Sequence, residues 1–430
     1  MERRTLEENR ENKRDYAVLV GLRSPVLRED NADEESLAEL AALVETAGGQ
    51  AVGTILQSRE KPDPHSFIGE GKVEEVRRMV QEEEATMVIF DNDLSPSQIR
   101  VLTEMTGVQV LDRSGLILDI FAQRAKTKEG CLQVELAQYQ YLLPRLVGMW
   151  THLERQAGTS GKGPIGSKGP GETQLETDRR HIRSRIAKLE EELTQVRQVR
   201  AVQRRQRIKN SVPVVALVGY TNAGKSTLLN RLTGAGIPAN NRLFDTLDTT
   251  SRQWTVSETL SVILSDTVGF IAKLPHHLVD AFRATLEELS FADLLIHVID
   301  ASDPERDSHI AVVDKLVEQL AKPGVPIIQC FNKADLVPPE ELPVGSNRVA
   351  ISAKAGSGLP ALLDLVEENL NRGQRRGILL FPYAQGGLLE QLHREAQVLS
   401  VEYTPDGIQV EAVCGPILYG RLKEFIVRES

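Results

Sequence analysis

The chain has 430 residues, of which 41% are hydrophobic and 26% charged, and its formal net charge is −10. A chain of this length exceeds one ordinary hydrophobic core, so roughly two to four domains are expected. No apolar run approaches the ~18 residues that a membrane span needs, and the charged opening MERRTLEENRENKRDY is not a secretory signal. Three scattered cysteines, Cys131, Cys330 and Cys414, favour a reducing compartment over a disulfide framework. These features predict a cytoplasmic protein without a membrane span, with residues 1–14 as a flexible leader.

In residues 15–125, apolar runs typical of strands alternate with helical patterns. Strands are predicted at 17–22, 52–56, 87–90 and 108–111, and helices at 34–47, 73–83 and 95–105. Such alternation predicts a small parallel sheet covered by helices. The turn Gly69-Glu70-Gly71-Lys72 is either phosphate-facing or a plain βα turn, and the plain turn is favoured. Asp91 and Asp93, at the end of the third strand, are either functional acids or part of a turn with a helix cap.

The apolar period changes in residues 126–210 to alternating steps of four and three, which is typical of a seam between helices. The two seams consist of Leu132, Leu136, Tyr139, Leu143, Leu146, Trp150 and Leu153, and of Ile182, Ile186, Leu189, Leu193 and Val196. The glycine-rich stretch between them, Gln156 to Thr173, is not expected to be helical. Two helices with a flexible joint predict an antiparallel hairpin, and Pro144 is expected to kink the first helix.

Basic residues concentrate in this hairpin although the whole chain is acidic. From Arg145 to Lys209 there are fifteen Lys or Arg against seven Asp or Glu, a local charge of +8, so the remainder carries −18. This asymmetry indicates a polyanionic partner for one segment. The candidate RNA contacts are Lys162, Lys168, Arg179, Arg180 and Arg183. The alternative is a solvated helical linker with ordinary surface charge.

A phosphate-binding loop is predicted after the apolar run Pro213–Val218. The sequence Gly219-Tyr220-Thr221-Asn222-Ala223-Gly224-Lys225-Ser226 fits G-x-x-x-x-G-K-S, and a helical pattern beginning at Thr227 follows it. Backbone N–H groups and the helix N-terminus of such a loop surround phosphate oxygens. Lys225 is expected to reach the β- and γ-phosphates and Ser226 to hold Mg²⁺. The nucleotide contacts in this loop are Gly219, Tyr220, Thr221, Asn222, Ala223, Gly224, Lys225, Ser226 and Thr227.

Three further motifs follow predicted strands, where ligands bind in open α/β sheets. They are Asp266-Thr267-Val268-Gly269, Asn332-Lys333-Ala334-Asp335 and Ser352-Ala353-Lys354. The Asp335 carboxylate can accept hydrogen bonds from N1–H and the 2-amino group of guanine, which adenine cannot supply. Four motifs in this order predict that residues 211–372 form a Ras-like P-loop domain that binds GTP and GDP.

Catalysis is expected to depart from the Ras pattern. Mg²⁺ is expected at Ser226, Asp266 and Thr250, with Thr249 and Ser251 as alternatives to Thr250 and an ordinary loop hydroxyl as the plain alternative. Phe270 stands where a glutamine normally orients the attacking water, so no catalytic residue is assigned. Asn222 is a candidate K⁺ ligand, because some GTPases with this asparagine and an apolar residue after D-x-x-G bind K⁺ near the phosphates.

The sequence resembles the HflX family of translational GTPases over nearly its whole length. The resemblance lies in GEGKVEE (69–75), LQVELAQ (132–138), GPGETQLETDRR (169–180), GYTNAGKSTLLN (219–230) and DTVGF (266–270). It implies binding to the 50S subunit and the 70S ribosome, with the hairpin near the peptidyl transferase centre, and ribosome-stimulated hydrolysis that splits or rescues stalled ribosomes under stress. Thr249 stands where family members commonly have a proline before the paired threonines. The choice of Thr250 as the switch I residue, the loop hydroxyl that binds Mg²⁺ in the GTP state, therefore stays open.

After residue 373 the chain is predicted to form a small α+β domain, with strands at 377–381 and 408–413 and a helix at 387–395. The predicted fold class is therefore α/β: a small parallel α/β domain, a long helical hairpin, a Ras-like GTPase domain and a C-terminal α+β domain (373–430). The leading hypothesis is a monomeric GTPase that acts on ribosomes. The alternative is a nucleotide-dependent switch or scaffold for a protein partner, with incidental hydrolysis.

Overall fold

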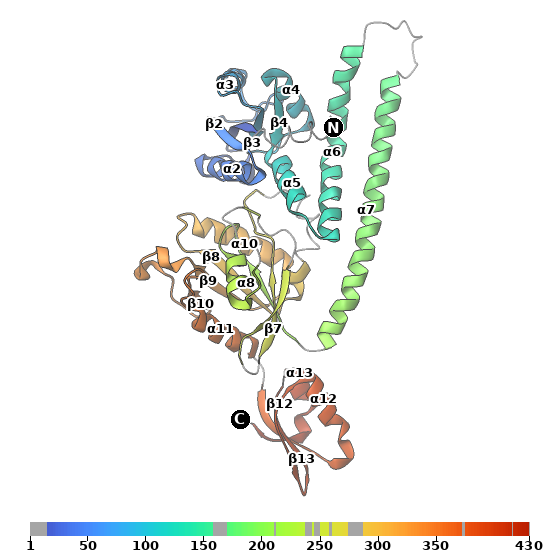
Figure 1. The fold of residues 1–430 in the computed structure, drawn as a ribbon, viewed down its shortest axis with the longest axis vertical. Coiled ribbons are helices and arrows are strands. Elements are labelled where there is room, and N and C mark those ends of the chain that lie inside the picture. The colour runs from blue at the N-terminus through green and yellow to red at the C-terminus, as the bar shows by residue number, and fades with distance from the viewer. Residues whose placement is uncertain are drawn as a thin grey trace, which may run out of the picture. The chain divides into compact units, whose positions relative to one another are not determined.

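The computed structural model describes residues 15–157, 170–209, 212–236, 243–244, 250–257, 260–273, 287–371, 375–414 and 416–429 (Figure 1). Contacts divide the chain into two compact units. The first comprises Met1–Thr194, Asn240–Asp248 and Ile271–Arg283. The second comprises Gln195–Ala239, Thr249–Phe270 and Ala284–Ser430. The first unit thus includes two short segments whose sequence lies within the GTP-binding region.

The N-terminal sheet of the first unit is parallel, as predicted. Its strands are β1 (Tyr16–Arg23), β2 (Gln50–Ser58), β3 (Met87–Phe90) and β4 (Gln109–Asp112), in the order β2-β1-β3-β4. Its helices are α2 (Glu34–Ala47), α3 (Glu70–Glu82), α4 (Pro96–Thr106) and α5 (Arg113–Arg124). Capping boxes at Asp33 and Ser95 fix the starts of α2 and α4. Since the chain leaves β1 on one side for β2 and returns on the other for β3, the carboxyl ends of β1 and β3 form a topological switch point.

Helix α5 is an element for which the sequence patterns made no prediction. It follows β4 without a loop, because the buried Asp112 ends the strand and accepts a hydrogen bond from Gly115 N–H at 2.9 Å as the helix cap. Eight of its residues are buried, from Arg113 to Phe121. A helix buried on most sides lacks the one-sided apolar period that identifies surface helices.

The predicted hairpin consists of α6 (Lys128–Ala157) and α7 (Pro170–Lys209), which run side by side in Figure 1. The prediction that Gln156 to Thr173 is not helical is wrong at both ends, because α6 includes Gln156 and Ala157 and α7 begins at Pro170. A proline is well suited to the first turn of a helix, since its missing N–H would have no partner there. Helix α6 continues through Pro144.

Both predicted seams contribute buried side chains to the hairpin: Leu132 and Leu136 from α6, and Leu189 and Leu193 from α7. The Arg185 guanidinium bonds both carboxylate oxygens of Glu135 at 2.7–2.9 Å and links the two helices. Helix α6 is also joined to the sheet, where Tyr141 Oη donates to Asp112 Oδ1 at 2.8 Å.

The sheet of the second unit has the order β10-β9-β8-β5-β7-β6, parallel except for β6. Its strands are β5 (Val214–Val218), β6 (Thr250–Thr255), β7 (Ser261–Asp266), β8 (Leu294–Asp300), β9 (Ile327–Asn332) and β10 (Arg348–Ala350). Its helices are α8 (Lys225–Thr233), α10 (Arg306–Leu320) and α11 (Leu359–Asn371). The central strands are nearly continuous apolar runs, and they are buried on both faces.

The C-terminal part is an antiparallel sheet with two helices. Its strands are β11 (Arg375–Phe381), β12 (Gln397–Thr404), β13 (Gly407–Cys414) and β14 (Ile426–Glu429), in the order β12-β13-β11-β14, and its helices are α12 (Gly387–Glu395) and α13 (Pro416–Arg421). Strand β12 was not predicted, because an irregular register between Val398 and Ser400 breaks its alternation.

Short 3₁₀ helices complete the described structure: η1 (Arg28–Asp30), η2 (Glu287–Phe291), η3 (Ala334–Leu336), η4 (Pro339–Glu341), η5 (Tyr383–Gln385) and η6 (Lys423–Phe425). Among the residues that the structure describes, no helix is both long and apolar enough to cross a lipid bilayer.

Candidate nucleotide-binding site

The predicted phosphate loop lies between β5 and α8, at the carboxyl edge of the sheet. Two of its glycines are sterically required. A Cβ on Gly219 (φ +154°) would lie 2.2 Å from the Val298 carbonyl oxygen, and one on Gly224 (φ +96°) would lie 2.2 Å from Asn332 Nδ2. Asn222 is exposed and adopts φ +62°, so the loop has the tight left-handed turns that direct backbone N–H groups toward an anion.

Lys225 is a buried cation in this loop. Its Nζ donates to the carbonyl oxygens of Gly219 at 3.0 Å and Tyr220 at 2.8 Å. Burial lowers the pKa of the ammonium to about 8, although the charge of Asp266 acts in the opposite direction. A buried ammonium without a strong counter-charge is costly, and phosphate oxygens would supply that charge.

Three oxygen-bearing side chains lie near the start of α8. Ser226 Oγ donates to Asp266 Oδ2 at 2.8 Å, and the Asp266 side chain is fully buried. Thr250 is the first residue of β6 and pairs with Asp266 in the sheet. A hydroxyl and a carboxylate are hard oxygen donors of the kind that Mg²⁺ prefers. The residues present therefore fit a magnesium ion.

Of the three candidate hydroxyls for Mg²⁺, Thr249, Thr250 and Ser251, it is Thr250 that pairs with Asp266 in the sheet, while Ser251 pairs with Ser265 one step further along the strand. Thr249 lies outside the described residues.

The guanine motif follows β9 and is joined to the phosphate loop. Asn332 Nδ2 donates to the Ala223 carbonyl at 2.9 Å, and Asn332 Oδ1 accepts from Ala353 N–H at the same distance. Asp335 is exposed, and a hydrogen bond from Ser352 holds the pKa of its carboxyl below the ordinary value. It is therefore an accessible carboxylate for the N1–H and 2-amino groups of guanine.

Two contacts in this region were not predicted. Lys333 Nζ donates to Asp300 Oδ2 at 2.6 Å, which ties the guanine motif to the end of β8. The Tyr220 ring stacks on His309 of α10, with ring centroids 3.7 Å apart. The bond between Lys333 and Asp300 could have been suspected from the sequence, because Asp300 ends an apolar strand as the other motifs do. No local pattern indicates the second, since the two rings are far apart in sequence.

Phe270, in the position of the catalytic glutamine, is 2% exposed. Its N–H donates to the Gly219 carbonyl at 3.2 Å, and its carbonyl accepts from Thr221 N–H at 2.7 Å. These bonds make a short parallel bridge between the phosphate loop and the residue after D-x-x-G. The side chain packs inside the domain and cannot orient water.

The predicted RNA contacts are only partly described. Lys162 and Lys168 lie outside the described residues, whereas Arg180 and Arg183 on α7 are exposed and Arg179 is half-buried. Among the described residues, no group of three or more His, Cys, Asp or Glu side chains could hold a metal ion.

The strand–loop–helix and the guanine motif beside it define the GTP-binding P-loop class. Family models match residues 34–122 (GTP-binding GTPase N-terminal), 124–207 (GTP-binding GTPase Middle Region) and 214–333 (50S ribosome-binding GTPase). GTPase HflX of Caldanaerobacter subterraneus subsp. tengcongensis is 46% identical, covering 92% of this chain and 91% of that protein. GTPase HflX of Escherichia coli (strain K12) is 46% identical, covering 84% of this chain and 85% of that protein. The chain belongs to the HflX family of GTPases, and it binds and hydrolyses GTP.

Two solved structures also resemble the chain. The crystal structure of the SsGBP and GDP complex is 25% identical, with a TM-score of 0.47, and covers 84% of this chain and 99% of that one. A GTP-binding protein from Sulfolobus solfataricus in complex with GDP is 25% identical, with a TM-score of 0.43, and covers 83% of this chain and 99% of that one.

Proposed function

We propose that this GTPase binds the large ribosomal subunit and the 70S ribosome, and that it splits or rescues stalled ribosomes in the cytoplasm. The observation that carries the proposal is the hairpin. Helix α7 has 40 residues, which corresponds to about 60 Å at 1.5 Å per residue. Its exposed Arg180 and Arg183 lie in the segment that the sequence marks as basic. A long basic helix suits the phosphates of RNA, and the match to a 50S ribosome-binding GTPase model supports the same partner.

In this proposal the GTP-bound protein binds the ribosome and hydrolysis releases it. Mg²⁺, held by Ser226, Asp266 and Thr250, would neutralise charge on the β- and γ-phosphates. Lys225 then gains the counter-charge that it lacks among backbone carbonyls. Since Phe270 is buried and cannot orient water, we infer that ribosomal contacts complete the catalytic arrangement.

A K⁺ ion at Asn222 would supply part of the positive charge that an arginine supplies in other GTPases. The exposed position and left-handed backbone of Asn222 leave its side chain accessible to a cation. We expect faster hydrolysis in K⁺ than in Na⁺ buffer of equal ionic strength. Equal rates would remove K⁺ from the proposal and leave the ribosomal part standing.

The hairpin is tested by reversing its charge. In Arg179→Glu/Arg180→Glu/Arg183→Glu, binding to 50S subunits at physiological salt should fall at least tenfold, since each phosphate contact contributes to a salt-dependent affinity. GTP affinity should remain within twofold of the wild type, which serves as the control for folding. Shortening the segment between residues 158 and 171 should have a similar effect on 50S binding. Unchanged 50S binding in both variants would show that the hairpin is not the RNA contact.

A further inference from the structure

One hydroxyl of the phosphate loop is buried and has no hydrogen-bond partner. It belongs to Thr221, the third residue of the loop, which is 7% exposed. Among the residues that the structure describes, no group forms a hydrogen bond with its Oγ1. Buried polar atoms are nearly always paired, because an unpaired one destabilises the fold. An unpaired hydroxyl beside a ligand site is therefore a candidate for a bond to the ligand.

The backbone of Thr221 is bonded to the residue that follows D-x-x-G. Its N–H donates to the Phe270 carbonyl at 2.7 Å, next to the parallel bridge between Tyr220 and Phe270. This bond fixes Thr221 beside the position from which a glutamine orients the attacking water in Ras. The Phe270 ring is buried and has no polar atom. The Thr221 hydroxyl is therefore a polar side-chain group next to a position that has lost its own.

The side chain of Thr221 also lies close to the group that contacts the γ-phosphate. A Cβ built on Gly269 would lie 2.9 Å from Thr221 Cγ2 and 3.2 Å from Lys225 Nζ, so the methyl group and the ammonium border the same glycine. The lysine of a phosphate loop reaches the β- and γ-phosphates.

A rotation of the Thr221 side chain is sufficient to bring its hydroxyl to this place. Threonine occupies staggered rotamers, and a turn of about 120° about χ1 moves Oγ1 to the position of Cγ2. Because Oγ1 has no partner, the turn breaks no hydrogen bond. A hydroxyl has one donor hydrogen and two acceptor lone pairs, so it can bond a phosphate oxygen and a water molecule together.

We propose that Thr221 is a catalytic residue for GTP hydrolysis, and that its hydroxyl holds the attacking water against the γ-phosphate. Oγ1–H donates to a γ-phosphate oxygen, and a lone pair of Oγ1 accepts from the water, which is thereby held in line with the bond that breaks. GDP has no γ-phosphate, so its affinity does not depend on this hydroxyl.

Thr221 orients the water and exchanges no proton with it. The water oxygen bonds to the γ-phosphorus, and the bond from this phosphorus to the β,γ-bridging oxygen breaks with its electron pair on GDP. A proton of the water ends on the released phosphate. The proposal concerns the basal reaction without ribosomes, so it does not depend on the proposed ribosomal function. Ribosomal contacts would act in addition to Thr221.

The test is single-turnover GTP hydrolysis by the full-length protein, with saturating protein and no ribosomes. Thr221→Val removes the hydroxyl and keeps the branched shape, and its rate should be at least tenfold below that of the wild type. Thr221→Ser keeps the hydroxyl, and its rate should stay within threefold. The dissociation constant for GDP should stay within twofold in both variants. Thr233→Val is the matched control with an unchanged rate, because the Thr233 hydroxyl bonds the Leu229 carbonyl at 2.8 Å within α8.

Thermal unfolding of the nucleotide-free proteins separates catalysis from a structural role. Because the hydroxyl is buried without a partner, Thr221→Val should unfold at the same temperature as the wild type or at a higher one. A lower unfolding temperature would overturn the proposal, since it would show that the hydroxyl is bonded within the fold. A loss of rate below tenfold in Thr221→Val would also overturn it, as would an equal loss in Thr221→Ser or Thr233→Val.

Discussion

Asn332 and Ala223 join the guanine motif to the phosphate loop by a hydrogen bond of 2.9 Å from Nδ2 to the carbonyl oxygen. Asn332 is 3% exposed, so its replacement leaves two buried backbone groups unpaired. Each such group costs about 1–3 kcal/mol. We predict that Asn332→Ala lowers the unfolding free energy of the nucleotide-free protein by about 2–6 kcal/mol and weakens GDP binding as well.

Asp335→Ala provides the contrast, because Asp335 is exposed. Its loss should weaken guanine nucleotide binding strongly and leave thermal stability almost unchanged. Thermal unfolding and GDP titration of both variants check the prediction. Equal stability of the two variants would mean that the bond between Asn332 and Ala223 does not support the fold.

Phe270→Gln should not create a Ras-like catalyst. The side chain at this position packs into the core, and its backbone is fixed by Gly219 and Thr221. Burial of an unpaired amide in place of an aromatic ring should cost about 2–4 kcal/mol. We predict lower thermal stability and an intrinsic GTPase rate no higher than that of the wild type. A tenfold faster single-turnover rate would show that the side chain at this position reaches the water.

Loss of the Asp112 side chain should destabilise the hairpin far more than loss of the Glu135 side chain. Asp112 is fully buried and accepts from Tyr141 at 2.8 Å and from Arg145 at 2.9 Å, so its loss leaves Arg145 uncompensated. Breaking such a pair costs about 3–5 kcal/mol. The side chains of Glu135 and Arg185 are each about one-third exposed. Ion pairs with this much exposure contribute at most about 1 kcal/mol to stability.

We therefore predict a large loss of stability in Asp112→Ala and a small one in Glu135→Ala. Thermal unfolding measures both, and hydrogen exchange in α6 identifies where the loss occurs. A larger loss in Glu135→Ala would contradict the assignment.

The pH dependence of stability should include a contribution from Asp30. Burial, followed by the charge of Asp93, raises the pKa of Asp30 to about 7. The folded chain therefore keeps a proton that the unfolded chain releases near pH 4. Stability from this group is present at low pH and is lost as the pH rises from about 4 to about 7.

Asp30→Asn should remove this titration and stabilise the protein above pH 7 by about 1–3 kcal/mol, less than the full shift implies because Asp30 is not completely buried. The gain should shrink steadily toward pH 4. Unfolding temperatures of both proteins at pH 8, 6 and 5 measure it. A gain independent of pH would assign the effect to something other than ionisation.

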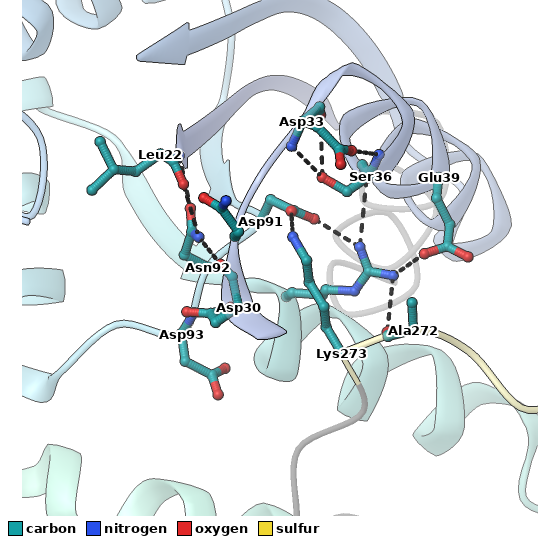
Figure 2. A network of polar contacts seen from close by, with 12 residues as sticks. Leu22, Asp30, Asp33, Ser36, Glu39, Asp91, Asn92, Asp93, Ala272 and Lys273 are labelled. Atoms are coloured by element: carbon teal, nitrogen blue, oxygen red, sulfur yellow. Dashed lines mark hydrogen bonds and ion pairs between the residues drawn. The ribbon is translucent and has the colours of Figure 1, made fainter. Parts of the chain in front are cut away.

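The sequence was sufficient for the parallel sheets, the phosphate loop and the family. Each of these depends on local patterns: apolar runs such as β5, glycines with positive φ such as Gly219 and Gly224, and motifs at strand ends. The β12 strand and α5 were not predicted, since an irregular register and burial on most sides obscure their periods. The Asp91–Arg113–Lys273 group of ion pairs (Figure 2) could not be predicted, because tertiary packing brings Lys273 to Asp91, which lies 182 positions earlier in the chain.

The GTPase rate with and without purified 50S subunits, in K⁺ buffer, tests the central claim most directly. Because Phe270 cannot place the attacking water, we predict that 50S subunits raise the rate at least tenfold. The Arg179→Glu/Arg180→Glu/Arg183→Glu variant should lose most of this stimulation and keep its basal rate. An unchanged rate with saturating 50S subunits would contradict a ribosome-acting GTPase and would favour a switch that acts on a protein partner.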